Sequence, residues 1–238
     1  MGYRTRTMFP WPLVGRSSLL LASLLLAAGH FPRTGVATAP PALPLSASEY
    51  SVVTLGDSSS GVDVDVFLDL VCIDTKKAWP VIKQVIQTYD RAVQWRFHQF
   101  PLPYHTNAFM VAKGAVVAAT YGNDTAALRY MDIAFARQIQ VSNELTQGMT
   151  YKAVEGVVAA WVQEATGLER EVVRRKLQEG GVEEAVRFSF KYATIRSIFG
   201  TPMFVINQML VPGLDGGSDV MDWEEYLAPL LTQMARES

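Results

Sequence analysis

Two short segments soon after residue 50 predict β-strands, and hydrophobic and polar residues alternate in the second of them. Residues 51–55 form one candidate strand. Between residues 62 and 68, valines alternate with Asp63 and Asp65, as expected of a strand with one buried face and one face toward water. The other predicted strands cover residues 93–100, 203–206 and 209–211, the last two joined by a turn at Asn207-Gln208.

Apolar residues spaced three or four apart predict helices in most of the remaining chain. One helix should run from Ile73 to about Tyr89, with a kink at Pro80. Another should cover residues 150–165, with Thr150 as its N-cap. Further helices are expected over residues 106–121, 125–138, 169–178 and 182–198 and around residues 223–234. This order predicts one α/β domain over residues 49–238, with an all-helical insertion at about residues 106–198.

The first 39 residues have the pattern of a secretory signal peptide. No acidic residue precedes Glu49, and the run SSLLLASLLLAAG over residues 17–29, dominated by Leu and Ala, follows several arginines. Small residues around Ala37 and Ala39 provide a cleavage site. We therefore expect a protein of the secretory pathway, in the endoplasmic reticulum lumen or secreted. A retained signal anchor and an organelle transit peptide are the alternatives, and residues 40–48 read as a linker rich in Pro, Ala and Ser.

The charge balance argues against nucleic acid as a partner. The chain has 238 residues, of which 49% are hydrophobic, enough for a buried core. It carries 21 basic and 23 acidic residues, a net charge of −2. Cleavage after residue 39 would remove four arginines and make the rest more acidic. A mildly acidic surface offers no attraction to phosphate backbones or anionic lipids, so we expect neither nucleic-acid binding nor stable membrane insertion after cleavage.

Cys72 is the single cysteine of the chain, so an internal disulfide is impossible. With three histidines in addition, a structural zinc site of the usual Cys and His type is not expected, and no metal site is predicted. Cys72 follows the strand over residues 62–68 and precedes the helix that begins at Ile73. A thiol there faces unpaired backbone N–H groups at the positive end of the helix dipole, which favours the thiolate.

Several features together resemble the thioredoxin fold with the helical insertion of DsbA-like proteins. They are a strand leading to a cysteine that opens a helix, a proline eight residues after that cysteine, and a late Gly-Thr-Pro followed by a hairpin. Some stretches resemble eukaryotic secretory-pathway members of that group. These stretches are VFLDLVCIDTKKAWP (66–80), PLPYHTNAF (101–109), VRFSFKYATIR (186–196) and FGTPMFVIN (199–207).

The resemblance implies an active-site motif at Cys72, but its second cysteine is replaced by Thr75, which makes the motif CxxT. Without a partner thiol the chain cannot pass on an internal disulfide. It retains the capacity for monothiol chemistry, in which Cys72 attacks a disulfide and an external thiol such as glutathione releases it. Thr75 could donate its hydroxyl to the thiolate. The buried acid that thioredoxins often carry six residues before the cysteine is Val66 here, which leaves proton transfer less well provided for.

The same resemblance implies that Pro202 is a cis-proline facing Cys72 and that the backbone of Thr201 pairs with an extended substrate peptide. His105, after Pro-Leu-Pro-Tyr, is a candidate to lie near the cysteine and tune it, or else a hydrogen-bonded loop residue. Cys72 itself could be a reactive thiol or an inert buried one.

Three functions stay open from the sequence. The first is a monothiol thiol-disulfide exchange protein that acts on protein or peptide thiols and disulfides, with no cofactor other than glutathione as a co-substrate. The second is a non-catalytic peptide-binding or chaperone-like module that keeps the thioredoxin groove. The third is a kappa-type glutathione transferase or isomerase, which shares the helical insertion. Separately, Asn123-Asp124-Thr125 is an N-glycosylation sequon between two predicted helices, accessible if the chain enters the endoplasmic reticulum.

Overall fold

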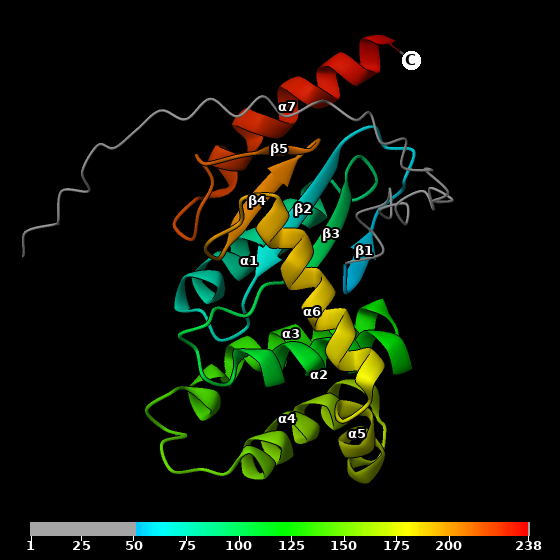
Figure 1. Ribbon diagram of the computed structural model, residues 1–238. Helices are drawn as coiled ribbons and strands as arrows, with labels where there is room; N and C mark the ends of the chain where they lie inside the picture. Colours follow the sequence, from blue (N-terminus) through cyan, green and yellow to red (C-terminus); the bar gives the residue numbers. More distant parts are fainter. Residues whose placement is uncertain (1–50, 238) are drawn as a thin grey trace, which may run out of the picture. The chain divides into compact units, whose positions relative to one another are not determined.

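The computed structural model describes residues 51–237, so the predicted signal peptide (1–39) and linker (40–48) lie outside the described residues. Within residues 51–237 the strands form one sheet of order β1-β3-β2-β4-β5 (Figure 1). β2 and β3 run parallel, and every other neighbouring pair is antiparallel. The strands are β1 (Val53–Leu55), β2 (Asp63–Leu68), β3 (Gln94–Gln99), β4 (Met203–Ile206) and β5 (Met209–Leu210).

Helices cover both faces of this sheet. α1 (Ile73–Thr88) and α7 (Val220–Glu237) pack on one face, where the Trp223 ring lies 4.7 Å from the Phe204 ring and 5.6 Å from the Trp95 ring. α6 (Gly180–Ile195) packs on the other face, where Tyr192 stacks against Phe67 at 6.1 Å between ring centroids. Because side chains alternate along a strand, each strand contributes to both layers of core.

A block of helices connects β3 to α6 (Figure 1). Thr150 caps α4 as predicted, since its Oγ1 accepts a hydrogen bond of 3.2 Å from the Ala153 N–H. α2 is buried along most of its length because α3, α4 and α6 all pack against it. The helices of this block are α2 (Ala108–Tyr121), α3 (Asp124–Ala136), the 3-10 turn η2 (Gln138–Val141), α4 (Tyr151–Thr166) and α5 (Arg170–Leu177). The α/β architecture with an all-helical insertion is therefore confirmed.

The prediction that β2 turns one face to water is wrong. Asp65 is fully buried because α6 covers that face of the sheet. Its carboxylate accepts a hydrogen bond of 2.6 Å from Arg96 Nε, and His98 Nε2 lies 2.9 Å from the same oxygen. A buried carboxylate needs such partners, and the central parallel pair of a sheet is commonly covered on both faces. The alternation of valine and aspartate therefore corresponds to the two faces of the sheet, each covered by different helices.

The ends of the elements follow local backbone chemistry. Asn207 and Gln208 have φ angles of 45° and 68°, so the predicted turn between β4 and β5 is a tight hairpin with two left-handed residues. α7 begins earlier than the apolar spacing indicates, because Asp219 Oδ1 accepts hydrogen bonds from the N–H groups of Met221 and Asp222. None of the helices in the described part of the chain combines the length and apolar character that a bilayer crossing requires.

Candidate functional site

Cys72 lies where β2 gives way to α1 and is the N-cap residue of that helix. Its φ and ψ of −74° and 128° are extended, and the Lys76 N–H donates to the Cys72 carbonyl over 3.1 Å, closing the first helical turn. In the first turn the N–H groups of Ile73, Asp74 and Thr75 have no acceptor within the helix. The sulfur is thus placed beside free backbone donors and the positive end of the helix dipole.

The Cys72 sulfur faces a segment that is remote in sequence. Its Sγ–H donates a hydrogen bond of 3.2 Å to the carbonyl oxygen of Thr201, and the Thr201–Pro202 peptide bond is cis. β4 begins at the next residue and pairs with β2, which leads to Cys72, so the sheet itself holds the two segments together. The structure therefore brings Cys72, Thr201 and Pro202 into one site.

The thiol is largely covered, with 6% of Cys72 exposed. It belongs to the smaller of two apolar clusters, on the sheet face that α6 covers, together with Phe67, Leu102 and Ile198. Large apolar side chains close in sequence to Cys72 or to Thr201 are nonetheless open to solvent: Ile73 is 55% exposed and Phe199 is 80% exposed. Solvated apolar surface of this kind is suited to contact with a polypeptide.

Thr75 stands one helical turn after Cys72, and its side chain is fully buried. Its hydroxyl has no hydrogen-bond partner among residues 51–237, so it does not donate to the Cys72 sulfur while that sulfur is a thiol. The Thr201 hydroxyl is also buried without a partner in the described part of the chain. Two buried hydroxyls therefore belong to the residues of this site and have unused donors.

His105 is a hydrogen-bonded loop residue. Its Nδ1 lies 2.7 Å from Asp69 Oδ2, and the same carboxylate accepts hydrogen bonds from the N–H groups of Leu102 (2.9 Å) and Val71 (2.8 Å). Burial raises the pKa of Asp69, and the bonds from His105 and from the two backbone N–H groups oppose that rise. Since the Cys72 N–H also donates to the Asp69 carbonyl over 3.1 Å, Asp69 joins the His105 loop to the turn that carries Cys72.

Gln138 is a residue of this site that sequence reasoning missed. Its buried side-chain amide donates to the carbonyl of Cys72 over 2.9 Å and to the carbonyl of Leu70 over 3.1 Å. Gln138 begins η2, so it attaches the helical insertion directly to the turn that carries Cys72. No motif surrounds Gln138, and only a contact map could have identified it.

Charged groups surround the opening of the site. The pKa of Lys77 is raised, first by its hydrogen bond of 2.9 Å to Asp74 and also by the nearby charge of the Cys72 sulfur. The pKa of Tyr104 is raised by burial and, to a smaller extent, by the charge of Cys72. A polar pocket of about 380 Å³ lies next to Thr201 and is lined by Asp74, Lys77, Thr201, Pro202, Asp215, Gly216 and Gly217.

Two other sequence predictions concern positions outside this site. Asn123 is exposed in the turn between α2 and α3, and its Oδ1 accepts a hydrogen bond of 2.9 Å from the Ala126 N–H as the N-cap of α3. Within residues 51–237 no three His, Cys, Asp or Glu side chains gather in a way that could hold a metal ion.

Comparison with known proteins relates this geometry to one family. A family model described as DSBA-like thioredoxin domain matches residues 63–227, which is more than half of the chain. No curated protein matches the sequence.

Solved structures share the fold at low sequence identity. Oxidised BdbD from Bacillus subtilis superposes with a TM-score of 0.63 at 15% identity, covering 77% of this chain and 94% of BdbD. DsbA from Chlamydia trachomatis gives 0.63 at 13% identity, covering 81% of this chain and 95% of that protein. The thiol-disulfide exchange protein alpha-DsbA2 from Wolbachia pipientis gives 0.59 at 18% identity, covering 75% of this chain and 86% of that protein.

Proposed function

Because the chain belongs to the family of DsbA-like thioredoxin domains, we propose that it carries out thiol-disulfide exchange of the monothiol type. The observation that carries this proposal is the position of Cys72, the single cysteine, at the start of α1 with its sulfur 3.2 Å from the Thr201 carbonyl. The nucleophile and the backbone that would receive a substrate are both present. A second protein thiol is absent from the sequence.

The reaction needs two exchanges. The Cys72 thiolate attacks one sulfur of a substrate disulfide, a Cys72–substrate disulfide forms, and the other substrate sulfur leaves as a thiolate that takes up a proton. An external thiolate such as that of glutathione then attacks the substrate sulfur of this mixed disulfide. The Cys72 thiolate is regenerated and the substrate leaves joined to glutathione. Overall, one disulfide and one thiol yield a new disulfide and a new thiol, with no net oxidation.

The residues around the sulfur supply what the thiolate form requires. Ionisation removes the hydrogen that the sulfur donates to Thr201 and leaves the Thr201 carbonyl free to pair with an incoming peptide N–H. The sulfur then becomes an acceptor, and the first-turn N–H groups of α1 are the donors beside it. The unpartnered Thr75 hydroxyl is the natural additional donor, reached by rotation of its side chain.

The polar pocket beside Thr201 and Pro202 is the proposed entrance for the external thiol. Glutathione carries two carboxylates and one ammonium group. Lys77 suits a carboxylate, and Asp215, on the opposite loop, suits the ammonium. Glutathione is the single co-substrate that the proposal needs.

The test measures glutathione-dependent cleavage of a disulfide that joins two different peptides, by the protein and by its Cys72→Ser variant. We expect activity that depends on Cys72 and a trapped Cys72–peptide disulfide in the mass spectrum when glutathione is left out. Thr75→Val, which removes the hydroxyl and keeps the shape, should slow the exchange about two- to tenfold, the worth of one hydrogen bond. The proposal would be refuted if Cys72 were alkylated more slowly in the folded protein than in the urea-unfolded chain and if the protein were no more active than Cys72→Ser.

The small exposed fraction of Cys72 supports a second candidate, a peptide-binding module without exchange chemistry. Such a module needs the backbone beside Pro202 and not the sulfur. Peptide binding that persists in Cys72→Ser and is lost in Pro202→Ala, in a protein without Cys72-dependent exchange, would establish this alternative. Binding that needs Cys72 would exclude it.

Location and modification complete the proposal. A leader over residues 1–39 would direct the chain into the secretory pathway, where protein thiols and disulfides are its partners. The exposed Asn123 would then be available for glycosylation. Expression of the full chain in mammalian cells, followed by N-terminal sequencing and glycosidase treatment, tests both points, and an intact Met1 in a cytosolic fraction would contradict them.

A further inference from the structure

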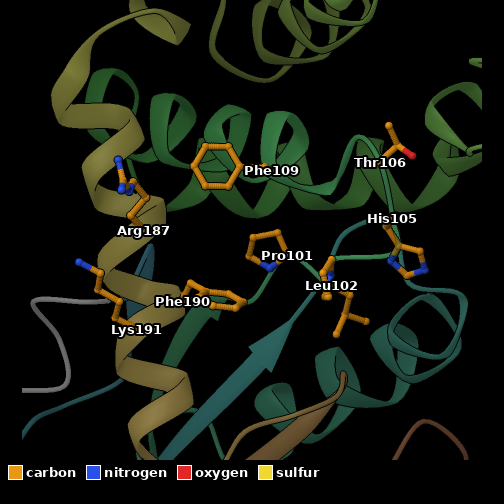
Figure 2. Close-up of a pocket in the computed structure, with 9 residues that line it drawn as sticks. Pro101, Leu102, His105, Thr106, Phe109, Arg187, Phe190 and Lys191 are labelled. Carbon is orange, nitrogen blue, oxygen red and sulfur yellow. The ribbon is translucent and has the colours of Figure 1, made fainter. Parts of the chain in front are cut away.

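An apolar pocket of about 360 Å³ lies between the loop at residues 101–106 and α6 (Figure 2). Pro101 and Leu102 line it from the loop, Phe109 from α2 and Phe190 from α6. Phe190 is held in place by stacking on Phe100, with ring centroids 4.8 Å apart and planes 6° from parallel. Rigid prolines and a stacked aromatic ring make this a preformed pocket, large enough for an apolar side chain.

The pocket is attached to the turn that carries the reactive sulfur. Leu102 belongs to the same apolar cluster as Cys72. The Leu102 N–H and His105 Nδ1, both in the pocket wall, bond to the carboxylate of Asp69, which is three residues before Cys72. Asp69 thus joins the wall of the pocket to the turn from which a polypeptide bound to Cys72 would extend.

Two cations mark one rim of the pocket, and its lining includes no carboxylate. Arg187 and Lys191 lie one turn apart on α6, and both are exposed (Figure 2). Lys191 has no ion pair among residues 51–237, and Arg187 has one long contact of 3.5 Å with the exposed Glu183. Such an exposed pair holds Arg187 only weakly, so both cations are available to an anionic group.

We propose that this pocket selects substrates: it holds an apolar side chain of the polypeptide joined to Cys72, while an adjacent carboxylate of that polypeptide pairs with Arg187 and Lys191. This inference rests on the proposed exchange function and defines its substrate class as acidic, apolar segments near a cysteine. A polypeptide is favoured over a free fatty acid because the pocket is open at the surface and shares its wall with the turn of the reactive sulfur.

The test compares peptides that each carry one cysteine activated as a disulfide with thionitrobenzoate. One set has a Phe-Glu pair at several distances from the cysteine, and matched sets have Phe-Lys or Ala-Glu instead. Thionitrobenzoate should be released about fivefold faster from the best Phe-Glu peptide than from either matched peptide. Two exposed ion pairs and one buried ring are expected to produce an effect of this size. The double variant Arg187→Glu/Lys191→Glu should reverse the order of Phe-Glu and Phe-Lys.

A matched control keeps the same change in net charge at a distance from the pocket. Arg129 and Lys152 are exposed on α3 and α4 and do not line it, so Arg129→Glu/Lys152→Glu should preserve the order of peptides. Equal rates for all peptides would overturn the inference and leave the exchange function standing.

Absence of Cys72-dependent release with every peptide would be a failure of the exchange function itself. In that case the peptide selectivity of the pocket is tested by fluorescence anisotropy, which measures peptide binding to the Cys72→Ser variant. Tighter binding of the Phe-Glu peptides supports the proposed selectivity, and equal affinities overturn it. Binding of dodecanoate without any preference among the peptides would also overturn it, in favour of a fatty acid as the occupant.

Discussion

Replacing Gln138 with methionine should destabilise the protein more than a typical surface change, because the Gln138 amide donates two buried hydrogen bonds to the turn of Cys72. Methionine has nearly the same length and no donor. The change would leave the carbonyls of Leu70 and Cys72 without this partner, and each lost bond is worth about 1 to 2 kcal/mol in a buried setting. The expected decrease in the free energy of unfolding is therefore about 2 to 4 kcal/mol, a large part of the stability of a typical domain.

Urea denaturation followed by circular dichroism measures this decrease. Gln140→Met is the matched control, since Gln140 lies two residues further on in η2, is exposed and accepts one bond of 3.3 Å from Trp161 Nε1. We expect the control to lose less than about 1 kcal/mol. A loss in Gln138→Met no larger than in Gln140→Met would refute the role assigned to the Gln138 amide.

Three further predictions concern buried or capping groups. Burial raises the pKa of Asp69 in the folded protein, so the stability that this carboxyl contributes is fully present below its ordinary pKa of about 4 and is lost as the pH rises through the folded value. Asp69→Asn should therefore destabilise less at about pH 7 than at about pH 4 in urea titrations, and a pH-independent difference would contradict this sign. Burial raises the pKa of Tyr192 to about 12, so Tyr192→Phe should remove phenolate absorbance that develops at about pH 12 and leave the ordinary tyrosine titration near pH 10 unchanged. Asn123→Gln should cost about 1 kcal/mol through loss of the α3 cap, whereas Asn123→Asp keeps a capping oxygen and should be nearly neutral in unglycosylated protein; equal effects of the two would argue against the cap.

The predicted elements that were found are those whose patterns depend on local physics. The helix beginning at Ile73 continues through Pro80 as α1, and Thr150 caps α4, because capping and periodicity act within a few residues. The side assigned to Asp65 was wrong, because alternation shows that two faces differ and does not show what covers each one. That cover is α6, which follows Asp65 in the chain by more than one hundred residues.

The residues of the candidate site also fall into those that the sequence indicated and those that only the structure showed. Cys72, Thr201 and Pro202 were singled out through a family resemblance, and the structure places the Cys72 sulfur against the Thr201 carbonyl, next to Pro202 in the chain. The roles of Gln138 and Asp69 in holding the turn escaped detection, since an isolated glutamine or aspartate in a sequence carries no sign of which distant carbonyl or N–H it will meet.

The amino-acid sequence by itself determined the order of strands and helices, the charge and the presence of one thiol with no partner thiol in the chain. Those features depend on residue type and on spacing within a few positions. Only the tertiary structure decided that the Cys72 sulfur contacts the Thr201 carbonyl, that the thiol is nearly buried, and that Arg187 and Lys191 line an apolar pocket. Such contacts join segments that lie many residues apart, and packing of the whole core determines which of them meet.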